Sequence, residues 1–332
     1  MKVLITGGAG FIGSTIASAL LDSDHVPVIL DNLITGRREF VEGRIFYEGS
    51  VSDKDLVSRI FAEHPDISAV VHCAALIVVP ESVAQPARYY EANVVETLRL
   101  IEALLDVGCE RLIFSSSASI YVPGADFSVN EDSPVAPMSP YARTKVVIED
   151  MLREIAAVTP LRVMSLRYFN PVGADPEFRT GLQVREPTHA LGKLVELTKQ
   201  GLPFAITGND YPTRDGSGIR DYVHVWDLAA AHVAALERFD DALGNETCTV
   251  INLGTGRGTT VTELVDTFAS VIGRPVPTVV APRRPGDAAG AFTKSDKAER
   301  VLGWKAEHSL AEGIADTLRW FEVRPERLPD LA

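Results

Sequence analysis

The stretch Thr6-Gly-Gly-Ala-Gly-Phe-Ile-Gly13 decides the fold. It follows a short apolar run at 2–6 and precedes a helical pattern at 12–21. Glycines at positions 8, 10 and 13 have the spacing that allows a tight turn, backbone approach to a pyrophosphate and close packing of a helix on a strand. Asp31 ends the next apolar run, 18 residues after Gly13, where a carboxylate can bind an adenosine ribose. This context predicts dinucleotide binding.

The same aspartate favours NAD over NADP as the cofactor, because its carboxylate repels a 2′-phosphate. Arg37 and Arg38 follow within a few residues, and an arginine near this position can bind that phosphate. Both can equally be solvated residues of a loop. The sequence therefore predicts NAD, and the arginine pair is the reason to test NADP.

The first half of the chain alternates between short runs rich in Val, Ile and Leu and longer helical patterns. We expect parallel strands at 2–6, 26–30, 70–72, 111–115 and 161–168, and helices at 12–21, 89–105 and 141–157. This order predicts right-handed βαβ units in an α/β, Rossmann-type doubly wound parallel sheet.

The second half has Pro- and Gly-rich loops between its helices, which we expect at 190–199, 225–237 and 261–272. We therefore predict an NAD-binding Rossmann domain at 1–170 and a smaller C-terminal substrate lobe at 171–332. The segment near 222–254 ends in a strand pattern at 250–253 and can return to the main domain.

Composition excludes several classes of partner. The net charge of −13 disfavours nucleic acid and anionic membranes. An 18-residue apolar run is absent from the sequence, and the N-terminus enters a strand pattern directly, so we expect a cytoplasmic protein. Cys73, Cys109 and Cys248 are widely spaced, without a Cys-x-x-Cys pair or a histidine cluster, so we expect free thiols and no metal site.

Residues Ser139-Pro-Tyr-Ala-Arg-Thr-Lys145 place a tyrosine and a lysine four apart, just after a proline. Proline suits the first turn of a helix, and residues at i and i+4 share one face. Tyr141 and Lys145 can therefore point at the same group. The alternative from this stretch alone is a tyrosine packed on a lysine stem.

Together with the dinucleotide fold, this Tyr-x-x-x-Lys spacing resembles the short-chain dehydrogenase/reductase superfamily, and Phe114–Tyr121 resembles its serine-bearing strand. Further segments resemble the extended branch and, within it, the UDP-glucose 4-epimerase family. These segments are Leu30–Leu33, Tyr90–Val94, Arg167–Gly173, Gly208–Gly218, Arg220–Val225 and Arg284–Asp287. The resemblance covers almost the whole chain.

The resemblance implies an isomerase that epimerises C4 of a UDP-hexose through a transient 4-keto sugar, with NAD as a bound prosthetic group, in a homodimer. The implied catalytic residues are Ser117, Tyr141 and Lys145. The implied substrate ligands are Asn170, Arg220, Arg284 and Asp287. The implied cofactor-binding residues are Gly7, Gly10, Phe11, Ile12, Gly13, Asp31, Asn32, Ser50, Val51, Ala74, Ala75, Asn93, Tyr141, Lys145 and Tyr168, with Asn93 also supporting the active-site helix.

Three positions depart from the family pattern. Ser50 stands where an aspartate usually holds the adenine, and Ile77 where a lysine usually contacts the cofactor, so the grip on NAD can be weaker. Ala291 stands where a larger residue can close the sugar pocket, which leaves room for a bulkier sugar.

The loop at 175–189 follows the Asn-Pro turn and, in the family, lines the hexose. Here it contains Arg179, Arg185 and His189, which we include among the substrate-binding candidates. An arginine fork matches a carboxylate, so one of the two arginines could bind a uronate, although either could instead be a solvated residue paired with Glu177 or Glu186. UDP-glucuronate/UDP-galacturonate and UDP-glucose/UDP-galactose therefore rank level as substrates, with UDP-N-acetylhexosamines third.

Other functions share this scaffold. A sugar-nucleotide 4,6-dehydratase needs an acid and a base just after the active-site hydroxyl, whereas Ser117 is followed by Ala118 and Ser119. A UDP-glucuronate decarboxylase would release CO₂. A non-catalytic NAD-binding regulator would not need Tyr141 and Lys145, which this chain retains.

Overall fold

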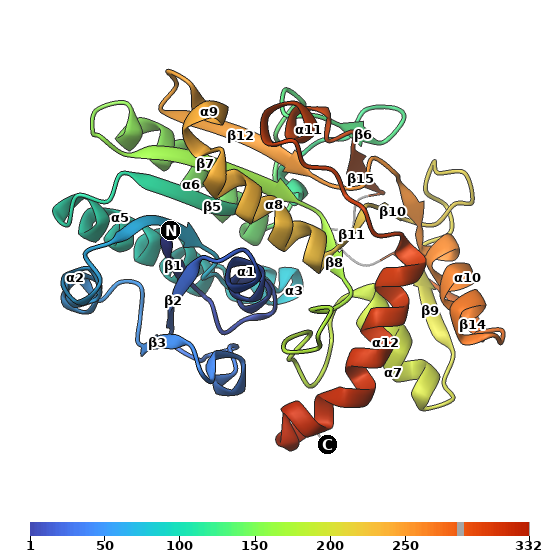
Figure 1. Cartoon of the computed structure of the whole chain (residues 1–332). Helices are drawn as coiled ribbons and strands as arrows, with labels where there is room; N and C mark the ends of the chain where they lie inside the picture. Colours follow the sequence, from blue (N-terminus) through green and yellow to red (C-terminus); the bar gives the residue numbers. More distant parts are fainter. Residues whose placement is uncertain (284–288, 332) are drawn as a thin grey trace.

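The computed structural model describes residues 1–283 and 289–331 of this chain. Its centre is a seven-stranded parallel sheet in the order β12-β7-β5-β4-β1-β2-β3. The strands are β1 (Lys2–Thr6), β2 (Val26–Asp31), β3 (Ile45–Glu48), β4 (Ile67–His72), β5 (Arg111–Ser117), β7 (Arg162–Tyr168) and β12 (Cys248–Leu253). Figure 1 shows the sheet beside a second group of elements that contains most of the C-terminal half. The predicted Rossmann-type sheet is confirmed.

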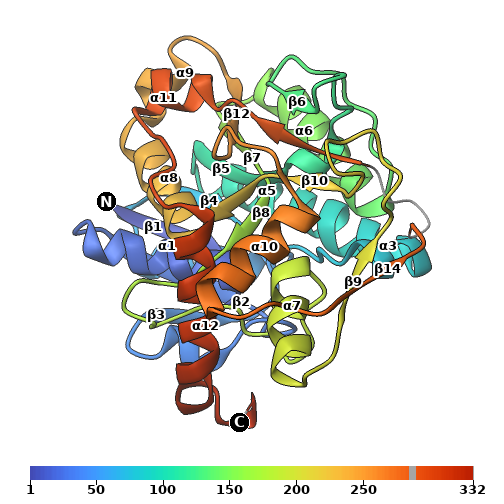
Figure 2. The same cartoon turned by 90° about the vertical axis from the view of Figure 1, so that its right-hand side faces the viewer.

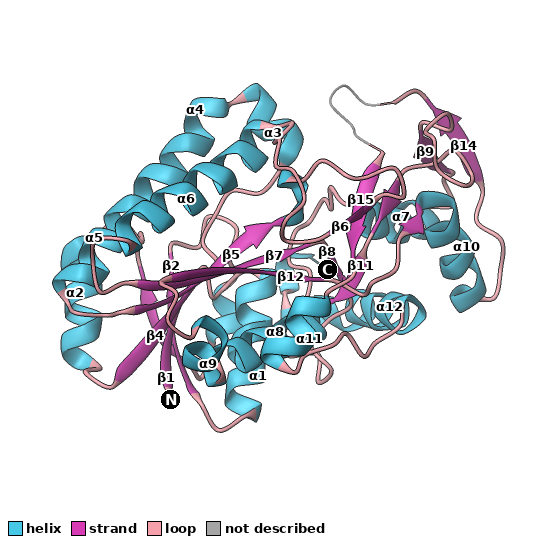
Figure 3. Ribbon diagram, turned by 90° about the horizontal axis from the view of Figure 1, so that it is seen from above, coloured by secondary structure: helices cyan, strands magenta, loops and turns pink. Residues whose placement is uncertain are grey.

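Helices cover both faces of this sheet, as Figure 3 shows from above. One face packs against α1 (Phe11–Asp22), α8 (Val225–Glu237), α9 (Phe239–Leu243) and α11 (Asp296–Leu302). The other face packs against α2 (Lys54–Glu63), α5 (Glu96–Asp106) and α6 (Pro140–Ala156). Because both faces are covered, the strand interiors are apolar and fully buried, as at Leu4, Val70 and Ile113.

The strand order reverses between β1 and β4, which lie side by side in the middle of the sheet. In open α/β sheets the crevice at the carboxyl ends of the strands on either side of such a point is where ligands bind. The glycine-rich stretch follows β1 and opens α1 at this position. The topology therefore places the predicted dinucleotide site at the carboxyl edge of the sheet.

The range predicted as a helix at 89–105 is helical throughout, but its first part is a π-helix rather than an α-helix. After α3 (Val79–Ala84), the chain forms a short α4 (Pro86–Tyr89), then a π-helical segment η2 (Tyr90–Val95), and only then α5. Single π-helical segments often occur at functional sites. Here the segment contains Asn93, whose side chain is fully buried.

The second lobe lies at the carboxyl side of the sheet (Figure 2). It contains the pair β8 (Asn170–Val172) and β11 (Tyr222–His224), the pair β9 (Phe204–Thr207) and β14 (Thr278–Ala281), and the helices α7 (Ala190–Lys199), α10 (Val261–Ile272) and α12 (Leu310–Arg327). A third sheet has the order β13 (Thr259–Thr260), β10 (Ile219–Arg220), β15 (Gly290–Thr293) and β6 (Ser128–Val129). Short 3₁₀ turns lie at η1 (Arg38–Val41), η3 (Ala118–Ile120) and η4 (Pro329–Leu331).

The two lobes exchange segments. β12 pairs with β7 in the main sheet, and α8 packs against α1, so residues well beyond position 170 complete the NAD-binding half. In return, β6 from the first half pairs with β15 of the second lobe. This exchange joins the second lobe to the main sheet.

A search of the described residues finds no helix long and apolar enough to cross a membrane. The same part of the chain contains no group of three or more His, Cys, Asp or Glu side chains that could hold a metal ion.

Candidate active site

The glycine-rich loop has the geometry that a dinucleotide requires. Gly7 adopts φ +70°, and a Cβ there would lie 2.6 Å from the backbone nitrogen of Ala74. The loop therefore touches the segment that follows β4, where Ala74 and Ala75 were predicted to bind the cofactor. Helix α1 begins at Phe11 after Gly10, without a side-chain cap. Its first N–H groups are thus left for a ligand anion, as a pyrophosphate requires.

Asp31 lies at the end of β2, next to this loop. Its Oδ2 accepts a hydrogen bond from the Ala9 N–H at 2.9 Å and its Oδ1 accepts one from the Leu33 N–H at 2.8 Å. Burial raises the pKa of Asp31, and these two backbone hydrogen bonds oppose the rise. Each carboxylate oxygen keeps a further lone pair, so the side chain can still accept a bond from a ribose hydroxyl.

Arg37 and Arg38, the two arginines that made NADP an alternative cofactor, are both paired with acidic side chains. Arg37 pairs with Asp330 of the C-terminal turn η4, and Arg38 pairs with Glu48 at the end of β3. A guanidinium that already has a carboxylate partner gains less from a 2′-phosphate. The geometry therefore agrees with NAD.

Ser50 and its neighbours follow β3 on the adenine side. The Ser50 hydroxyl donates to Glu96 at 3.0 Å and lies 2.8 Å from the Ser52 hydroxyl. Val51 is buried in the core beneath α2. Asn32 is exposed, and its side-chain oxygen accepts from the Ile34 N–H at 3.2 Å. Direct contacts of these residues with a cofactor remain predictions.

Tyr141 and Lys145 lie in the first two turns of α6, as the spacing predicted. Pro140 is the first residue of the helix, and the Ser139 hydroxyl caps it by accepting from the Ala142 N–H at 3.2 Å. The Lys145 side chain is buried, and its Nζ donates to the Ser115 carbonyl at 2.8 Å. That Nζ also lies 6.0 Å from the centre of the Tyr141 ring. The two side chains therefore share one helix face at the end of β5.

Ser117 is the last residue of β5 and pairs in register with Tyr168, the last residue of β7. The Ser117 hydroxyl accepts from the Ser119 N–H at 3.2 Å and lies 2.9 Å from the Ser119 hydroxyl. The Ser117 hydroxyl also interacts with the Tyr141 phenol. The structure thus brings together Ser117, Tyr141, Lys145 and Tyr168, four residues from three separate motifs.

Burial dominates the electrostatics of this group. It lowers the pKa of Lys145 to about 8. It also raises the pKa of Tyr141, and the bond from Ser117 only partly opposes the rise. The protein groups alone therefore keep Tyr141 as a neutral phenol, and a further positive charge is needed to make it a base near neutral pH.

Asn93 supports the active-site helix from the π-helical segment. Its Oδ1 accepts from the Leu76 N–H at 2.8 Å, and its Nδ2 donates to the Leu76 carbonyl at 3.0 Å and to the Thr144 hydroxyl at 3.1 Å. These bonds join the segment after β4 to the residue beside Lys145. Ile77, which follows Leu76, stands where the family pattern has a lysine, and its side chain is 62% exposed.

Asn170 and Arg220, two of the predicted phosphate ligands, lie in β8 and β10 of the second lobe. The Asn170 N–H donates to the Asp221 carbonyl at 3.0 Å, so Asn170 lies beside the residue that follows Arg220 in the chain. The Arg220 guanidinium donates to the carbonyls of Ile219 and Ala289 at 2.7 and 2.8 Å. Gly290 has φ +110°, and a Cβ there would lie 2.0 Å from Nη1 of Arg220. Glycine at 290 therefore makes room for this arginine.

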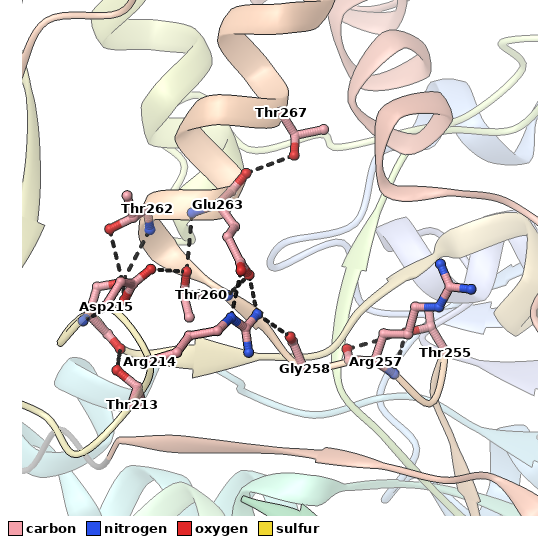
Figure 4. Close-up of polar contacts among 11 residues, drawn as sticks. Thr213, Arg214, Asp215, Thr255, Arg257, Gly258, Thr260, Thr262, Glu263 and Thr267 are labelled. Atoms are coloured by element: carbon pink, nitrogen blue, oxygen red, sulfur yellow. Dashed lines mark hydrogen bonds and ion pairs between the residues drawn. The ribbon is translucent and has the colours of Figure 1, made fainter.

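Arg284 and Asp287, the other two predicted UDP ligands, lie outside the described residues. The loop at 208–218, which the resemblance also singled out, is held by a polar network (Figure 4). Arg214 pairs with Glu263 of α10 and donates to the Gly258 carbonyl at 2.7 Å. Ser217 accepts from the Thr262 N–H at 3.2 Å. These contacts fasten the loop to the N-terminus of α10.

In the loop at 175–189, the contacts of the two arginines do not support the hypothesis that one of them binds a uronate. Arg179 binds both carboxylate oxygens of Asp22 at the end of α1, at 2.7 and 2.8 Å, and also pairs with buried Asp175 at 2.7 Å. Arg185 donates to the Asp330 carbonyl. Both guanidinium groups are therefore engaged by the protein itself, which removes the structural basis for an arginine that clamps a uronate.

His189 caps α7, with its Nδ1 accepting from the Gly192 N–H at 3.2 Å. Burial lowers its pKa to about 4, so the ring is neutral at physiological pH. The accepting Nδ1 places the proton on Nε2, which is buried and has no partner among the described residues. A contact with the substrate remains a prediction.

The sequence interpretation missed a buried ion pair beneath the active-site helix. Glu149, one turn after Lys145, bonds the Arg167 side chain, with a 2.9 Å distance from Nε to Oε1, and accepts from the Ser116 hydroxyl at 2.5 Å. Arg167 also donates to the Tyr121 hydroxyl at 2.7 Å. The sequence signal for this pair was Glu149 itself, a charged residue four positions after Lys145 and therefore on the same face of the helix.

Comparisons with known proteins agree with this geometry. Residues 3–254 match the model of the "NAD dependent epimerase/dehydratase family". The chain is 42% identical over 338 residues to a UDP-glucose 4-epimerase of Bacillus subtilis (strain 168), covering 96% of each protein. It is also 41% identical over 326 residues to a UDP-glucose 4-epimerase of Azospirillum brasilense, with 96% and 91% covered.

A solved structure agrees equally well. The UDP-glucose 4-epimerase of Stenotrophomonas maltophila, with bound NAD and formylated UDP-arabinopyranose, has a TM-score of 0.93 and 37% identity to this chain. The match covers 98% of this chain and 99% of that one. With the glycine-rich loop, the Tyr-Lys helix and the second lobe all in place, the chain belongs to the NAD dependent epimerase/dehydratase family.

Proposed function

We propose that this protein is a UDP-sugar 4-epimerase that keeps NAD bound and interconverts UDP-glucose and UDP-galactose. The observation that supports this most is the convergence of Ser117, Tyr141 and Lys145 at the carboxyl edge of the sheet, beside the dinucleotide loop. Relatives named UDP-glucose 4-epimerase cover almost the whole chain. Asn170 and Arg220 provide the polar groups that a diphosphate needs.

In this mechanism Tyr141 takes the proton of the sugar 4-hydroxyl as C4 loses its hydride. Ser117 holds the same oxygen by a hydrogen bond. When bound, NAD would supply the hydride acceptor and a positive charge. Once the 4-keto sugar has rotated to present its other face, Tyr141 would return the proton to the sugar oxygen as C4 regains its hydride.

Lys145 has a defined part in this cycle. A free phenol has a pKa of about 10, so a phenolate near pH 7 requires about 3 pKa units, or roughly 4 kcal/mol, of stabilisation. The Lys145 ammonium is buried close to the Tyr141 ring, where a charge acts more strongly than in water. Its lowered pKa of about 8 still leaves it largely protonated at pH 7.

The sugar is the finer part of the proposal. Arg179 and Arg185 are both engaged elsewhere, so no observation favours a uronate. Ala291 favours a second substrate class. It packs in a cluster with Ala118, the residue after Ser117, and Ala142, the residue after Tyr141. A small side chain there leaves space for an N-acetyl group on the sugar.

A panel of UDP-sugars tests the proposal. UDP-glucose and UDP-galactose should each give the other when incubated with the purified protein, as separated by anion-exchange chromatography. UDP-N-acetylglucosamine should also be converted, and an Ala291→Tyr variant should lose that conversion while keeping the glucose reaction. Ala289→Ser, two residues away, is the matched control. Equal loss of both reactions in Ala291→Tyr would contradict the role of Ala291.

The same panel separates the alternative functions. A 4,6-dehydratase would give a 4-keto-6-deoxy sugar, a decarboxylase would release CO₂ from UDP-glucuronate, and a binding protein would convert nothing. In the structure, the residue positions after Ser117 hold Ala118 and Ser119, and the Ser119 hydroxyl contacts Ser117. A carboxylic acid is thus missing where a dehydratase needs one.

We further propose a cytoplasmic homodimer. All three cysteines are free, as suits a reducing compartment. Val83 and Val95, which flank the short helix α4, are 62% and 37% exposed and offer apolar surface for a second copy. Light scattering after size-exclusion chromatography should give twice the 36.0 kDa mass of one chain.

A further inference from the structure

Three separate segments meet at the loop that links β2 to η1, residues 32–37, which we term the adenosine loop. This loop follows Asp31, the predicted ligand of the adenosine ribose. The Arg37 N–H donates to the Ala9 carbonyl at 2.9 Å, so the loop wraps against the glycine-rich turn. The other two segments come from the second lobe and from the C-terminal turn.

Gln183 of the second lobe reaches this loop directly. Its Nε2 donates to the Thr35 carbonyl at 3.0 Å. The same nitrogen lies 4.0 Å from where a Cβ on Gly10 would be, so the amide lies next to the phosphate-binding turn as well. The side chain is only 7% exposed. One residue of the second lobe therefore contacts the adenosine loop and lies near the glycine-rich turn.

The other amide atom of Gln183 indicates that stability alone does not explain this residue. Its Oε1 is buried and has no partner among the described residues. Reversing the amide would bring that oxygen against the Thr35 carbonyl, and two acceptors repel. A buried acceptor without a partner is unfavourable for the fold, and a leucine of similar size would avoid it.

Asp330 in the C-terminal turn η4 provides the second connection. Its carboxylate pairs with Arg37 of the adenosine loop, and its carbonyl accepts from Arg185 of the second lobe. The Arg37 side chain in this ion pair is partly buried, with 22% of it exposed. Arg185 of the second lobe thus reaches the adenosine loop only through Asp330, which lies 145 positions further along the chain.

We propose that Gln183 and Asp330 form a latch by which the second lobe holds the adenosine loop closed over bound NAD. This inference rests on the NAD dependence of the proposed function. In that cycle NAD ends each turnover as it began, so its release is never required. A latch at the adenosine end, away from Tyr141 and Lys145, can slow release without touching the reacting atoms.

The rate at which NAD leaves the holoenzyme tests the latch. The purified protein, loaded with NAD, is diluted into an excess of a dehydrogenase that reduces released NAD, and NADH absorbance is followed. Gln183→Leu should raise the release rate by about 3- to 10-fold, as expected for losing one neutral hydrogen bond. Asp330→Asn should raise it by about 2- to 3-fold, as expected for a partly exposed ion pair.

A second readout separates a latch from a structural role. Gln183→Leu removes the unpaired buried oxygen. Because Thr35 is exposed, its carbonyl can accept a hydrogen bond from water in place of the lost amide. The NAD-free variant should therefore melt at or above the melting temperature of the parent. Epimerase turnover at saturating NAD should stay within twofold of the parent. A lower melting temperature with unchanged NAD release would assign Gln183 to the fold and overturn the proposal.

Asp22→Asn is the matched control. It breaks the Arg179 contact between the same second-lobe loop and the far end of α1, while leaving the adenosine loop intact. NAD release should stay at the parent rate in this variant. An equal rise in Asp22→Asn would show general loosening of the lobes and contradict a latch at 183 and 330. Failure of the epimerase proposal itself would appear separately, as absence of sugar conversion by the parent.

Discussion

Replacing Glu149 by glutamine is expected to destabilise the protein strongly, although the two side chains have nearly the same shape. Glu149 and Arg167 are 4% and 7% exposed, and the carboxylate is held by Nε and Nη2 of the arginine. Burial disfavours the charged form of Arg167, but hydrogen bonds and charge from Glu149 outweigh it and raise the pKa of the guanidinium. The variant would leave that guanidinium buried without its carboxylate.

Breaking a buried ion pair from one side costs about 3–5 kcal/mol. A chain of 332 residues unfolds with an entropy of roughly 0.7 kcal/mol/K, so the melting temperature should fall by about 4–7 °C. Turnover should fall as well, because Glu149 lies one turn after Lys145 and fixes α6 against β5 and β7.

Differential scanning calorimetry of the parent and variant measures this. Asp240→Asn is the matched control, since Asp240 also pairs with arginines, Arg111 and Arg162, but is 52% exposed. Exposed pairs contribute about 0–1 kcal/mol, so the control should lose less than about 1.5 °C. A Glu149→Gln variant that melts within 1 °C of the parent, or no lower than the control, would refute the reasoning.

Three further predictions follow from the site and its surroundings. Tyr141→Phe should keep the fold and NAD but lower turnover by at least about 10²–10⁴-fold, and a rate within threefold of the parent would remove Tyr141 as the base. Acid extracts of the purified protein should contain NAD and not NADP, because Asp31 opposes a 2′-phosphate and both nearby arginines are paired; NADP alone would contradict this. Burial lowers the pKa of His72 to about 3 and of His189 and His232 to about 4, so between pH 6.5 and about 4 the unfolded chain binds more protons than the folded one. Burial also raises the pKa of Asp221 to about 6, which offsets one of these protons. Stability in urea titrations should therefore fall by about 2–3 kcal/mol per unit as pH drops near 5, and a flat profile would contradict the buried neutral histidines.

Local patterns in the sequence predicted the central sheet well. The strand at 2–6 and the helix at 225–237 lie where predicted, because a buried parallel strand and a helix packed on the sheet both need near-continuous apolar residues. The helix expected at 89–105 begins with a π-helical segment, in which Asn93 makes tertiary bonds that no local pattern shows. Helix α12 was not predicted, although the capping box of Ser309 and Glu312 marks its start.

The residues of the candidate site likewise fall into those that local patterns could predict and those that they could not. Tyr141 and Lys145 were accessible from spacing on one helix, and the glycine turn from its flanking strand and helix. The partners of Arg179 were not, because Asp22 lies 157 residues away and only the fold brings the two together. Gln183 was invisible for the same reason, since its contact with Thr35 spans 148 residues. Sequence patterns locate groups that share one element, whereas pairings across lobes depend on the tertiary structure.

The fate of a C4 deuterium label tests the central claim most directly. UDP-galactose labelled with deuterium at C4 is incubated with the purified protein, and the recovered UDP-sugars are analysed by mass spectrometry and NMR. The proposed mechanism predicts UDP-glucose that keeps deuterium at C4, because the hydride leaves and returns within one closed site. Loss of the label to solvent, or recovery of unchanged UDP-galactose alone, would contradict it.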